Sequence, residues 1–127
     1  MDIHNIPDCI ARAPLDPKGG IRITRVTGDE TCSFYAAEIA VGTKLRPHYH
    51  RHGIELYQIL SGTGTMKTGR KIGAVVRWDE KFSVGAGDCF TIAEGMVHQL
   101  ANNGNVPLRA AFVCPVAHLG NDRFFIR

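Results

Sequence analysis

Apolar and polar residues alternate in short runs along most of this chain. The run "IRITRVTG" at 21–28 alternates in this way, "CSFYAAEIAVG" at 32–42 is a longer extended run, and "IELYQILSG" at 54–62 ends in a turn. Successive side chains of a β-strand point to opposite faces of a sheet, so runs of this length and period predict strands. No segment carries a long apolar stripe at helical spacing. The pattern therefore indicates a protein built from strands.

The second half of the chain continues this pattern. The run "GTMKTGRKIGAVVRW" at 64–78 predicts a β-hairpin that turns about residues 68–71, and further strands are expected within 81–95, 97–104 and 107–118. Fourteen glycines separate these short runs. Short strands punctuated by glycine predict an all-β fold, an antiparallel sandwich or barrel. Neither the strand order nor the choice between sandwich and barrel follows from the pattern.

The two ends of the chain differ from this pattern. The first twenty residues are rich in proline and glycine, which predicts an irregular N-terminal arm at 1–20, packed along a single domain at 21–127. These helix-breaking residues are Pro7, Pro14, Pro17, Gly19 and Gly20. The tail "RFFIR" is predicted to be a terminal strand that joins the same sheet or a partner, and its two adjacent phenylalanines favour a dimer contact.

Composition and charge narrow the class of protein. Apolar residues make up 44% and charged residues 21%, which is ordinary for a folded globular domain. The net charge is +3, and the Lys and Arg residues are scattered over the whole length, so a nucleic-acid partner is not indicated. The sequence lacks both a basic, apolar secretion signal at its start and an apolar run long enough to span a bilayer. We therefore expect a cytoplasmic protein without a membrane partner.

The four cysteines lie far apart and form no Cys-x-x-Cys pair. This spacing argues against a structural zinc cluster or a redox motif. The cysteines, which include Cys89 and Cys114 near the expected barrel interior, are interpreted as reduced, mostly buried and inert thiols.

Three histidines occupy alternate positions in "HYHRH" at 48–52. On a strand His48 and His50 project side by side, so both imidazoles can reach one ion. Glu55 opens the next predicted strand and can meet them from a neighbouring strand if the chain turns back. His98 follows a turn at Gly95, and an antiparallel barrel can place it opposite the first pair. The four side chains are therefore a candidate metal site.

Three imidazoles and a carboxylate form a mixed nitrogen and oxygen ligand set. Such a set suits Fe, Mn, Ni, Zn or Cu, and the sequence leaves the identity of the expected divalent ion open. With four protein ligands, a five- or six-coordinate ion keeps one or two positions for water, substrate or dioxygen. That arrangement is typical of a catalytic site rather than a closed structural one.

These residues carry a resemblance to the cupin superfamily, in particular to small single-domain barrels of the cupin-2 type. The segment "GTKLRPHYHRHGIELYQILSG" at 42–62 resembles the first cupin motif, and "GDCFTIAEGMVHQLAN" at 87–102 resembles the second. The matching positions are Gly42, His48, His50, Glu55 and Gly62 in the first motif and Gly87, Gly95, His98 and Asn102 in the second. One position departs: Ala93 stands where the family usually has proline, which affects the rigidity of a turn and leaves the ligands intact.

The resemblance implies a double-stranded β-helix, or jelly-roll, barrel with a metal inside. His48, His50, Glu55 and His98 would hold that metal, and such barrels are commonly homodimers. The resemblance implies no particular substrate, because the superfamily includes oxygenases, isomerases, epimerases, decarboxylases, lyases and non-catalytic binding proteins.

Several residues near these ligands have two interpretations. Strand parity points Arg46 and Tyr57 into the same interior as the histidines. Arg46 is either a clamp for a substrate carboxylate or a surface arginine, and Tyr57 is either a hydrogen-bond donor to a metal-bound ligand or a packed aromatic. His52 is interpreted as a loop residue at the rim, with a shifted register through His50 and His52 as the alternative. His118 belongs either to a terminal strand or to a segment folded over the barrel mouth.

The sequence thus predicts a mononuclear metal-binding cupin, an enzyme acting on a small organic acid or sugar derivative. Bound iron would suit a dioxygenase, whereas zinc, manganese or nickel would suit an isomerase, decarboxylase or lyase. Apart from Tyr57, Glu38 or a displaced ligand, no clear acid or base is available, which favours oxygen chemistry. The alternative is a non-catalytic cupin that binds or senses a small ligand.

Overall fold

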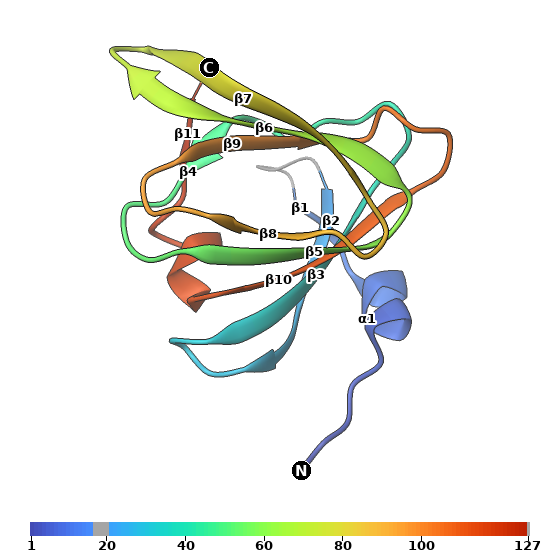
Figure 1. The fold of residues 1–127 in the computed structure, drawn as a ribbon. Coiled ribbons are helices and arrows are strands. Elements are labelled where there is room, and N and C mark those ends of the chain that lie inside the picture. Colours follow the sequence, from blue (N-terminus) through green and yellow to red (C-terminus); the bar gives the residue numbers. More distant parts are fainter. Residues whose placement is uncertain (17–20, 127) are drawn as a thin grey trace.

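The computed structural model describes residues 1–16 and 21–126 as two antiparallel sheets that face each other (Figure 1). The elements in chain order are α1 (Ile6–Arg12), β1 (Leu15–Asp16), β2 (Ile21–Gly28), β3 (Ser33–Ile39), β4 (His48–Tyr49), β5 (Glu55–Ser61), β6 (Thr63–Ile72), β7 (Val75–Gly85), β8 (Cys89–Ile92), β9 (Val97–Ala101), β10 (Leu108–Cys114), the 3-10 helix η1 (Val116–Leu119) and β11 (Phe124–Phe125). The predicted all-β barrel is confirmed. Pro17, Gly19 and Gly20 of the predicted arm, and Arg127 of the predicted last strand, lie outside the described residues.

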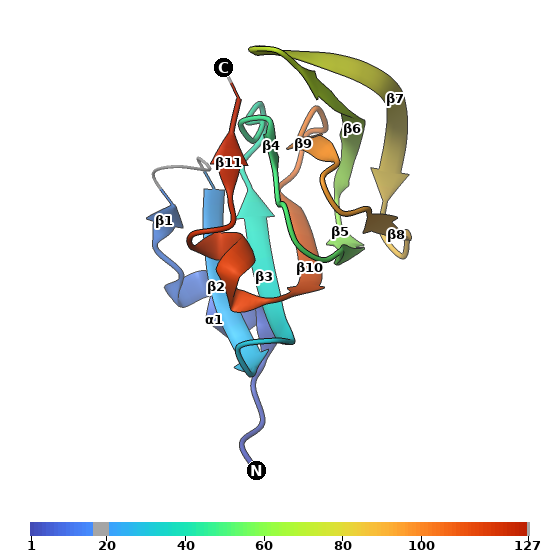
Figure 2. The ribbon, with the colours of Figure 1, turned by 90° about the vertical axis from the view of Figure 1, so that its left-hand side faces the viewer.

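The two sheets interleave segments that are distant in sequence. The six-stranded sheet has the order β1-β2-β3-β10-β5-β8, and the five-stranded sheet has the order β11-β4-β9-β6-β7. The chain therefore crosses repeatedly from one sheet to the other, and Figure 2 shows β11, β4, β9, β6 and β7 of one sheet beside β2, β3 and β10 of the other. Inward-facing side chains of both sheets fill the space between them with a single hydrophobic core.

Four aromatic rings form a ladder across the inner face of the six-stranded sheet. Tyr35, Phe112, Tyr57 and Phe90 are directly opposite one another on β3, β10, β5 and β8. Successive ring centroids are 5.3, 5.2 and 5.4 Å apart, and the planes are within 17° of parallel. Cross-strand aromatic pairs stabilise a sheet, and a slip of one residue would turn all four rings outward. The ladder therefore fixes the register of the strand that carries Glu55.

The predicted irregular arm is wrong for part of its length, because residues 6–12 form α1. Asn5 caps this helix by accepting a hydrogen bond from the Asp8 amide at 3.0 Å. Pro7 lies in the first turn, where a missing N–H costs nothing because that amide has no partner within the helix. The helix buries Ile10 and packs against β2 and β3 of the six-stranded sheet. Residues 15–16 then join this sheet as β1.

The predicted hairpin forms, but its predicted turn at 68–71 is wrong. The β6–β7 ladder runs from Thr63 opposite Gly85 to Ile72 opposite Val75, so the turn consists of Gly73 and Ala74. Gly73 has φ +59°, and a positive φ at the first turn residue alone is the pattern of a type II′ turn. Gly69 instead marks a β-bulge, where a Cβ would lie 2.2 Å from a backbone carbonyl oxygen of β7.

The C-terminal residues pair within the chain. Phe124 and Phe125 form β11 and pair with β4 at the edge of the five-stranded sheet, so the predicted terminal strand joins the same sheet. None of the helices within residues 1–16 and 21–126 has the length and apolarity needed to cross a membrane.

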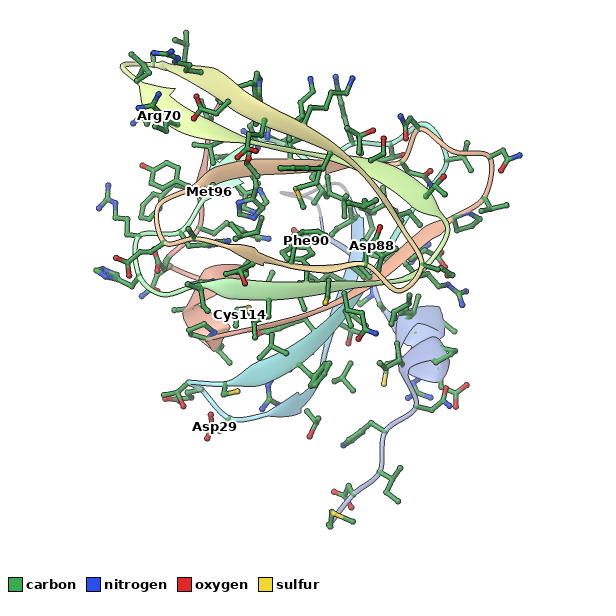
Figure 3. All side chains as sticks on the ribbon, viewed as in Figure 1. Asp29, Arg70, Asp88, Phe90, Met96 and Cys114 are labelled. Atoms are coloured by element: carbon green, nitrogen blue, oxygen red, sulfur yellow. The ribbon has the colours of Figure 1, made fainter. Side chains whose placement is uncertain are left out.

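All four cysteines are free, but the prediction that most are buried is wrong. Only Cys114, near the end of the ladder strand β10, is buried (Figure 3). Burial, followed by the charge of Glu55, raises the pKa of this thiol far above its ordinary value. Cys89 is exposed because it faces outward on the edge strand β8, and Cys32 is exposed before β3. Cys114 alone therefore fits the predicted inert thiol.

Asn102 connects two loops to the barrel from a buried position. Its side-chain amide donates to the carbonyls of Ile39 and Val106 at 2.9 and 2.8 Å, and its Oδ1 accepts from the Gly104 amide at 3.0 Å. Its side chain is almost fully buried. These contacts explain why an asparagine ends the second motif.

We predict that Asn102→Ala destabilises the fold by about 2–3 kcal/mol, because it leaves buried backbone groups without partners. Urea denaturation followed by circular dichroism measures this loss. The matched control is Asn103→Ala: that residue is exposed and donates one hydrogen bond, to Thr65, so its loss should stay below about 1 kcal/mol. Equal losses in the two variants would contradict the assigned role of Asn102.

Candidate metal centre

The four predicted metal ligands come together between the two sheets. His48 on β4 is directly opposite His98 on β9, both in the five-stranded sheet. His50 follows β4, and Glu55 begins β5 in the facing six-stranded sheet. The ring centroids of His48 and His98 are 4.2 Å apart, and that of His50 is 5.2 and 5.5 Å from them. All four side chains are buried.

A turn at Gly95 in the second motif is hydrogen-bonded to the first motif beside these residues. Gly95 adopts φ +77°, and its amide donates to the His50 carbonyl at 2.9 Å. The turn closes with a hydrogen bond from the Met96 amide to the Ala93 carbonyl at 3.1 Å. It thus forms with alanine in place of the usual proline, and β9 begins directly after it with His98 facing inward.

Each of the three imidazoles has its Nδ1 against a backbone carbonyl. In His48 and His98 the acceptor is the carbonyl two residues earlier in the chain, at 3.0 and 3.1 Å. In His50 it is the Asp122 carbonyl, at 2.6 Å. A carbonyl can only accept, so Nδ1 carries the hydrogen and Nε2 keeps a free lone pair. This tautomer is the one in which an imidazole binds a metal through Nε2.

Three buried polar atoms converge here without a hydrogen-bond partner in the described part of the chain. They are Nε2 of His50, Nε2 of His98 and Oε1 of Glu55. Oε1 of Glu55 is 3.3 Å from the His98 nitrogen, and Oε2 is 3.4 Å from the His50 nitrogen. Buried polar atoms without partners are costly, which indicates that these atoms bind something. One ligand atom from each histidine lies within 4.8 Å of the others, so the residues fit a transition metal ion.

The protonation states of this cluster suit a cation. Burial lowers the pKa of His48 well below its ordinary value, and the neighbouring His98 lowers it further. Burial by itself raises the pKa of Glu55, but the imidazoles of His118, His50 and His98 outweigh it and hold that pKa well below its usual range. At neutral pH, His48 is therefore neutral and Glu55 is ionised, as metal ligands must be.

His118 is a fifth member of the cluster that sequence reasoning did not identify as part of the site. It lies on η1, with no exposed surface, and its Nδ1 is 3.1 Å from Oε2 of Glu55. Its Nε2 is 2.5 Å from the carbonyl of His52, and its ring stacks on His50 with centroids 4.1 Å apart. Burial lowers its pKa, but the hydrogen bonds to Glu55 and His52 raise it overall. Of the two interpretations, the segment folded over the barrel interior is the one observed.

The predicted inward position of Arg46 is wrong. Arg46 is exposed, and its guanidinium lies over the ring of Phe125 at 4.5 Å from the centroid. Leu45 points inward in its place, because the chain before Pro47 forms only an isolated bridge and β4 begins at His48. Proline has no N–H for a sheet ladder, and the regular alternation of faces is interrupted there. The arginine that lines the interior cavity is Arg123, which pairs with Asp16 at 2.8 Å.

Tyr57 faces the interior as predicted. Its ring lies between Phe90 and Phe112 in the aromatic ladder and meets His98 edge to face at 6.2 Å. Burial, followed by the negative charge of Glu55, raises its pKa well above the ordinary value. The phenol therefore stays protonated at neutral pH and can serve as a hydrogen-bond donor, whereas it is a poor general base.

The remaining candidates lie outside the cavity. Glu38 is on the outer face of the six-stranded sheet, where it pairs with Arg109 at 2.9 Å. The side chain of His52 is exposed in the loop after β4, as predicted, and this loop contacts the cluster through its backbone.

A cavity adjoins Glu55 and three of the histidines, His48, His50 and His118. Its free space is about 30 Å³, room for about two water molecules. Apart from the cluster, the described lining is mostly apolar, with Tyr57 and Arg123 as its remaining polar side chains.

Comparisons with known proteins agree with this architecture. The family model described as "Cupin domain" matches residues 35–114. An uncharacterized protein of Methanocaldococcus jannaschii is 36% identical over 77 residues, which cover 61% of this chain and 54% of that protein. The chain thus spans about half the length of this curated relative.

Solved structures share the fold at low sequence identity. A cupin 2 conserved barrel domain protein from Salinispora arenicola has a TM-score of 0.69 and 19% identity, covering 95% of this chain and 93% of that one. A recombinant oxalate oxidase in complex with glycolate has a TM-score of 0.70 and 19% identity, covering 92% of this chain and 61% of that one. Because the family model extends over more than half of the 127 residues, and both motifs lie within it, the chain belongs to the cupin family.

Proposed function

We propose that this protein is a mononuclear metal-dependent enzyme that acts on a small organic acid. The observation that carries the proposal is the set of three buried imidazoles, each with Nδ1 bonded to a carbonyl, of which His50 and His98 have Nε2 within 3.4 Å of the ionised Glu55. His48, His50, Glu55 and His98 would hold one divalent transition metal ion. The ion would supply Lewis acidity or a binding position for dioxygen.

The cavity supports a small substrate. Its free space of about 30 Å³ suits a molecule of few heavy atoms, or dioxygen, and its lining is mostly apolar. Tyr57 would donate a hydrogen bond to the bound substrate and would not remove a proton from it. Among the described lining residues no further free base is present, which favours oxygen chemistry over an isomerisation that needs proton transfer.

Arg123 supports a substrate with a carboxylate. It lines the cavity, and its guanidinium lies 5.1 Å from the centroid of the Phe125 ring. The exposed Arg46 contacts the same ring. An arginine fork suits a carboxylate better than other common groups, and the similar oxalate oxidase structure contains glycolate, a small hydroxy acid.

A non-catalytic binding protein is the second candidate. The apolar lining, with no free acid or base beside the cluster among the described residues, is the observation that favours it. Turnover separates the two functions, because a binding protein leaves its ligand unchanged.

The cytoplasmic location stays a prediction.

We predict about one equivalent of a divalent transition metal per chain in protein purified anaerobically without a histidine tag or chelators. His50→Ala and His98→Ala should each reduce the metal content sharply and retain the strand signature in circular dichroism, because each removes one of the converging nitrogens. Elemental analysis by plasma mass spectrometry measures the content, and His4→Ala, which changes an exposed histidine outside the cluster, is the control. Full occupancy in either site variant would reject the ligand set.

We predict that Arg123→Met weakens the binding of oxalate or glycolate by about 10–100-fold, the value of one charge-assisted hydrogen bond. Arg46→Met is the matched control, and it should have a smaller effect because Arg46 is exposed. Isothermal titration calorimetry measures the affinities, and metal content should stay constant in both variants. If Arg46→Met has the larger effect, the exposed arginine is the acid-binding group.

We predict a homodimer, as the family resemblance implies. Light scattering on the full chain should give twice the mass of one chain over a range of protein concentrations. A mass of one chain at all concentrations would reject the dimer and leave the metal proposal unaffected.

A further inference from the structure

The segment at 115–126, which we name the C-terminal strap, lies beside three of the four proposed ligands. It follows β10, forms η1, and returns along β4 as β11 (Figure 2). Its start is fixed by a hydrogen bond from the Val116 amide to the Glu30 carbonyl, and its end by one from the Ile126 amide to the Pro47 carbonyl, both at 2.9 Å. Neither cupin motif includes any residue of the strap.

The strap holds the loop that carries His50. The Asp122 carboxylate accepts from the amides of Arg51 and His52 at 2.7 and 3.0 Å. The Asp122 carbonyl accepts from Nδ1 of His50 at 2.6 Å, and Phe125 is directly opposite His48 in the β4–β11 ladder. Two of the ligand histidines therefore have the strap as their outer support.

Glu55 has the most specific contact with the strap. One carboxylate oxygen, Oε2, lies 3.1 Å from Nδ1 of His118 and 3.4 Å from Nε2 of His50. The other, Oε1, has no hydrogen-bond partner among the described residues and lies 3.3 Å from Nε2 of His98. His118 has no freedom to turn away, because Nε2 donates to the His52 carbonyl, the ring stacks on His50, and no surface is exposed. Resting on the proposed metal function, we propose that His118 is a positioning residue that holds Oε2 of Glu55, so that Glu55 binds the metal through Oε1 alone.

His118 is not itself placed as a ligand. It lies close enough to His50 and Glu55 to form a three-residue group with them. However, both of its ring nitrogens already have partners, because Nδ1 lies against the Glu55 carboxylate and Nε2 lies against the His52 carbonyl. The Nε2 atoms of His50 and His98 instead form no hydrogen bond with the described residues, although they lie 3.4 and 3.3 Å from the Glu55 carboxylate. Outer partners of this kind orient the ligands and commonly affect metal affinity by about 10–100-fold.

Two substitutions at one position separate positioning from packing. His118→Asn keeps an N–H close to the position of Nδ1, whereas His118→Leu fills a similar volume and donates nothing. We expect His118→Leu to weaken Co²⁺ affinity by about 10–100-fold and to change the visible absorption bands of the bound ion, and we expect His118→Asn to restore most of the affinity and the wild-type bands. His4→Leu, outside the cluster, is the control for loss of a histidine.

The experiment is a titration of the full chain with Co²⁺ against a competing chelator, with circular dichroism to check the fold of each variant. Wild-type affinity and bands in His118→Leu would overturn the positioning role and leave the metal proposal standing. Equal loss in the Asn and Leu variants would overturn it in favour of a ligand or packing role. A wild-type chain that binds no Co²⁺ would overturn both proposals.

A second measurement uses the wild-type protein alone and so does not depend on the folding of a variant. In protein with ¹⁵N-labelled histidines, addition of Zn²⁺ should shift the Nε2 signals of His48, His50 and His98 as metal-bound nitrogens, while neither nitrogen of His118 should show the shift of a metal-bound nitrogen. Four shifted imidazoles would make His118 a ligand and overturn its positioning role.

Discussion

A buried carboxylate is the constraint on which the rest of this structure depends. Glu55 lies at the start of a strand inside an apolar barrel, where an ion without partners would be strongly destabilising. His118 and His50 lie against one of its oxygens, Oε2, and His98 lies against the other, Oε1. The imidazoles can lie at such distances because their outer nitrogens are bonded to carbonyls. The surrounding imidazoles thus allow the charged Glu55 carboxylate to lie in a core of hydrocarbon side chains.

The two-sheet topology makes this arrangement geometrically possible. The histidines lie on the five-stranded sheet and Glu55 lies on the six-stranded sheet, so the cluster exists only when the sheets face each other in the correct register. The aromatic ladder fixes the strand of Glu55, and the turn at Gly95 fixes the strand of His98. Tyr57 belongs to both the ladder and the cavity, and it therefore joins the packing of the core to the environment of the cluster.

Features with a local signal could be predicted from the sequence, whereas features that depend on distant partners could not. The alternation of apolar and polar residues predicts the strands, and the spacing of the two motifs predicts four residues of the cluster. The sequence cannot tell whether Gly69 lies in a turn or in a bulge, because both favour glycine, and only the opposite strand provides the close backbone approach that requires it. Pro7 predicts a break in a helix, yet the first helical turn accepts proline. His118 lies 63 residues from Glu55 in the sequence, and no motif near either residue predicts that they are in contact.

The position of the strap also has a consequence for biosynthesis. A ribosome makes the chain from its N-terminus, so His48, His50, Glu55 and His98 all leave the exit tunnel before His118 and Asp122. Until then Glu55 has no strap residue at Oε2, and the loop after β4 lacks its carboxylate cap. The complete centre can therefore form only once translation has passed the strap, because His50 and Glu55 both depend on its contacts.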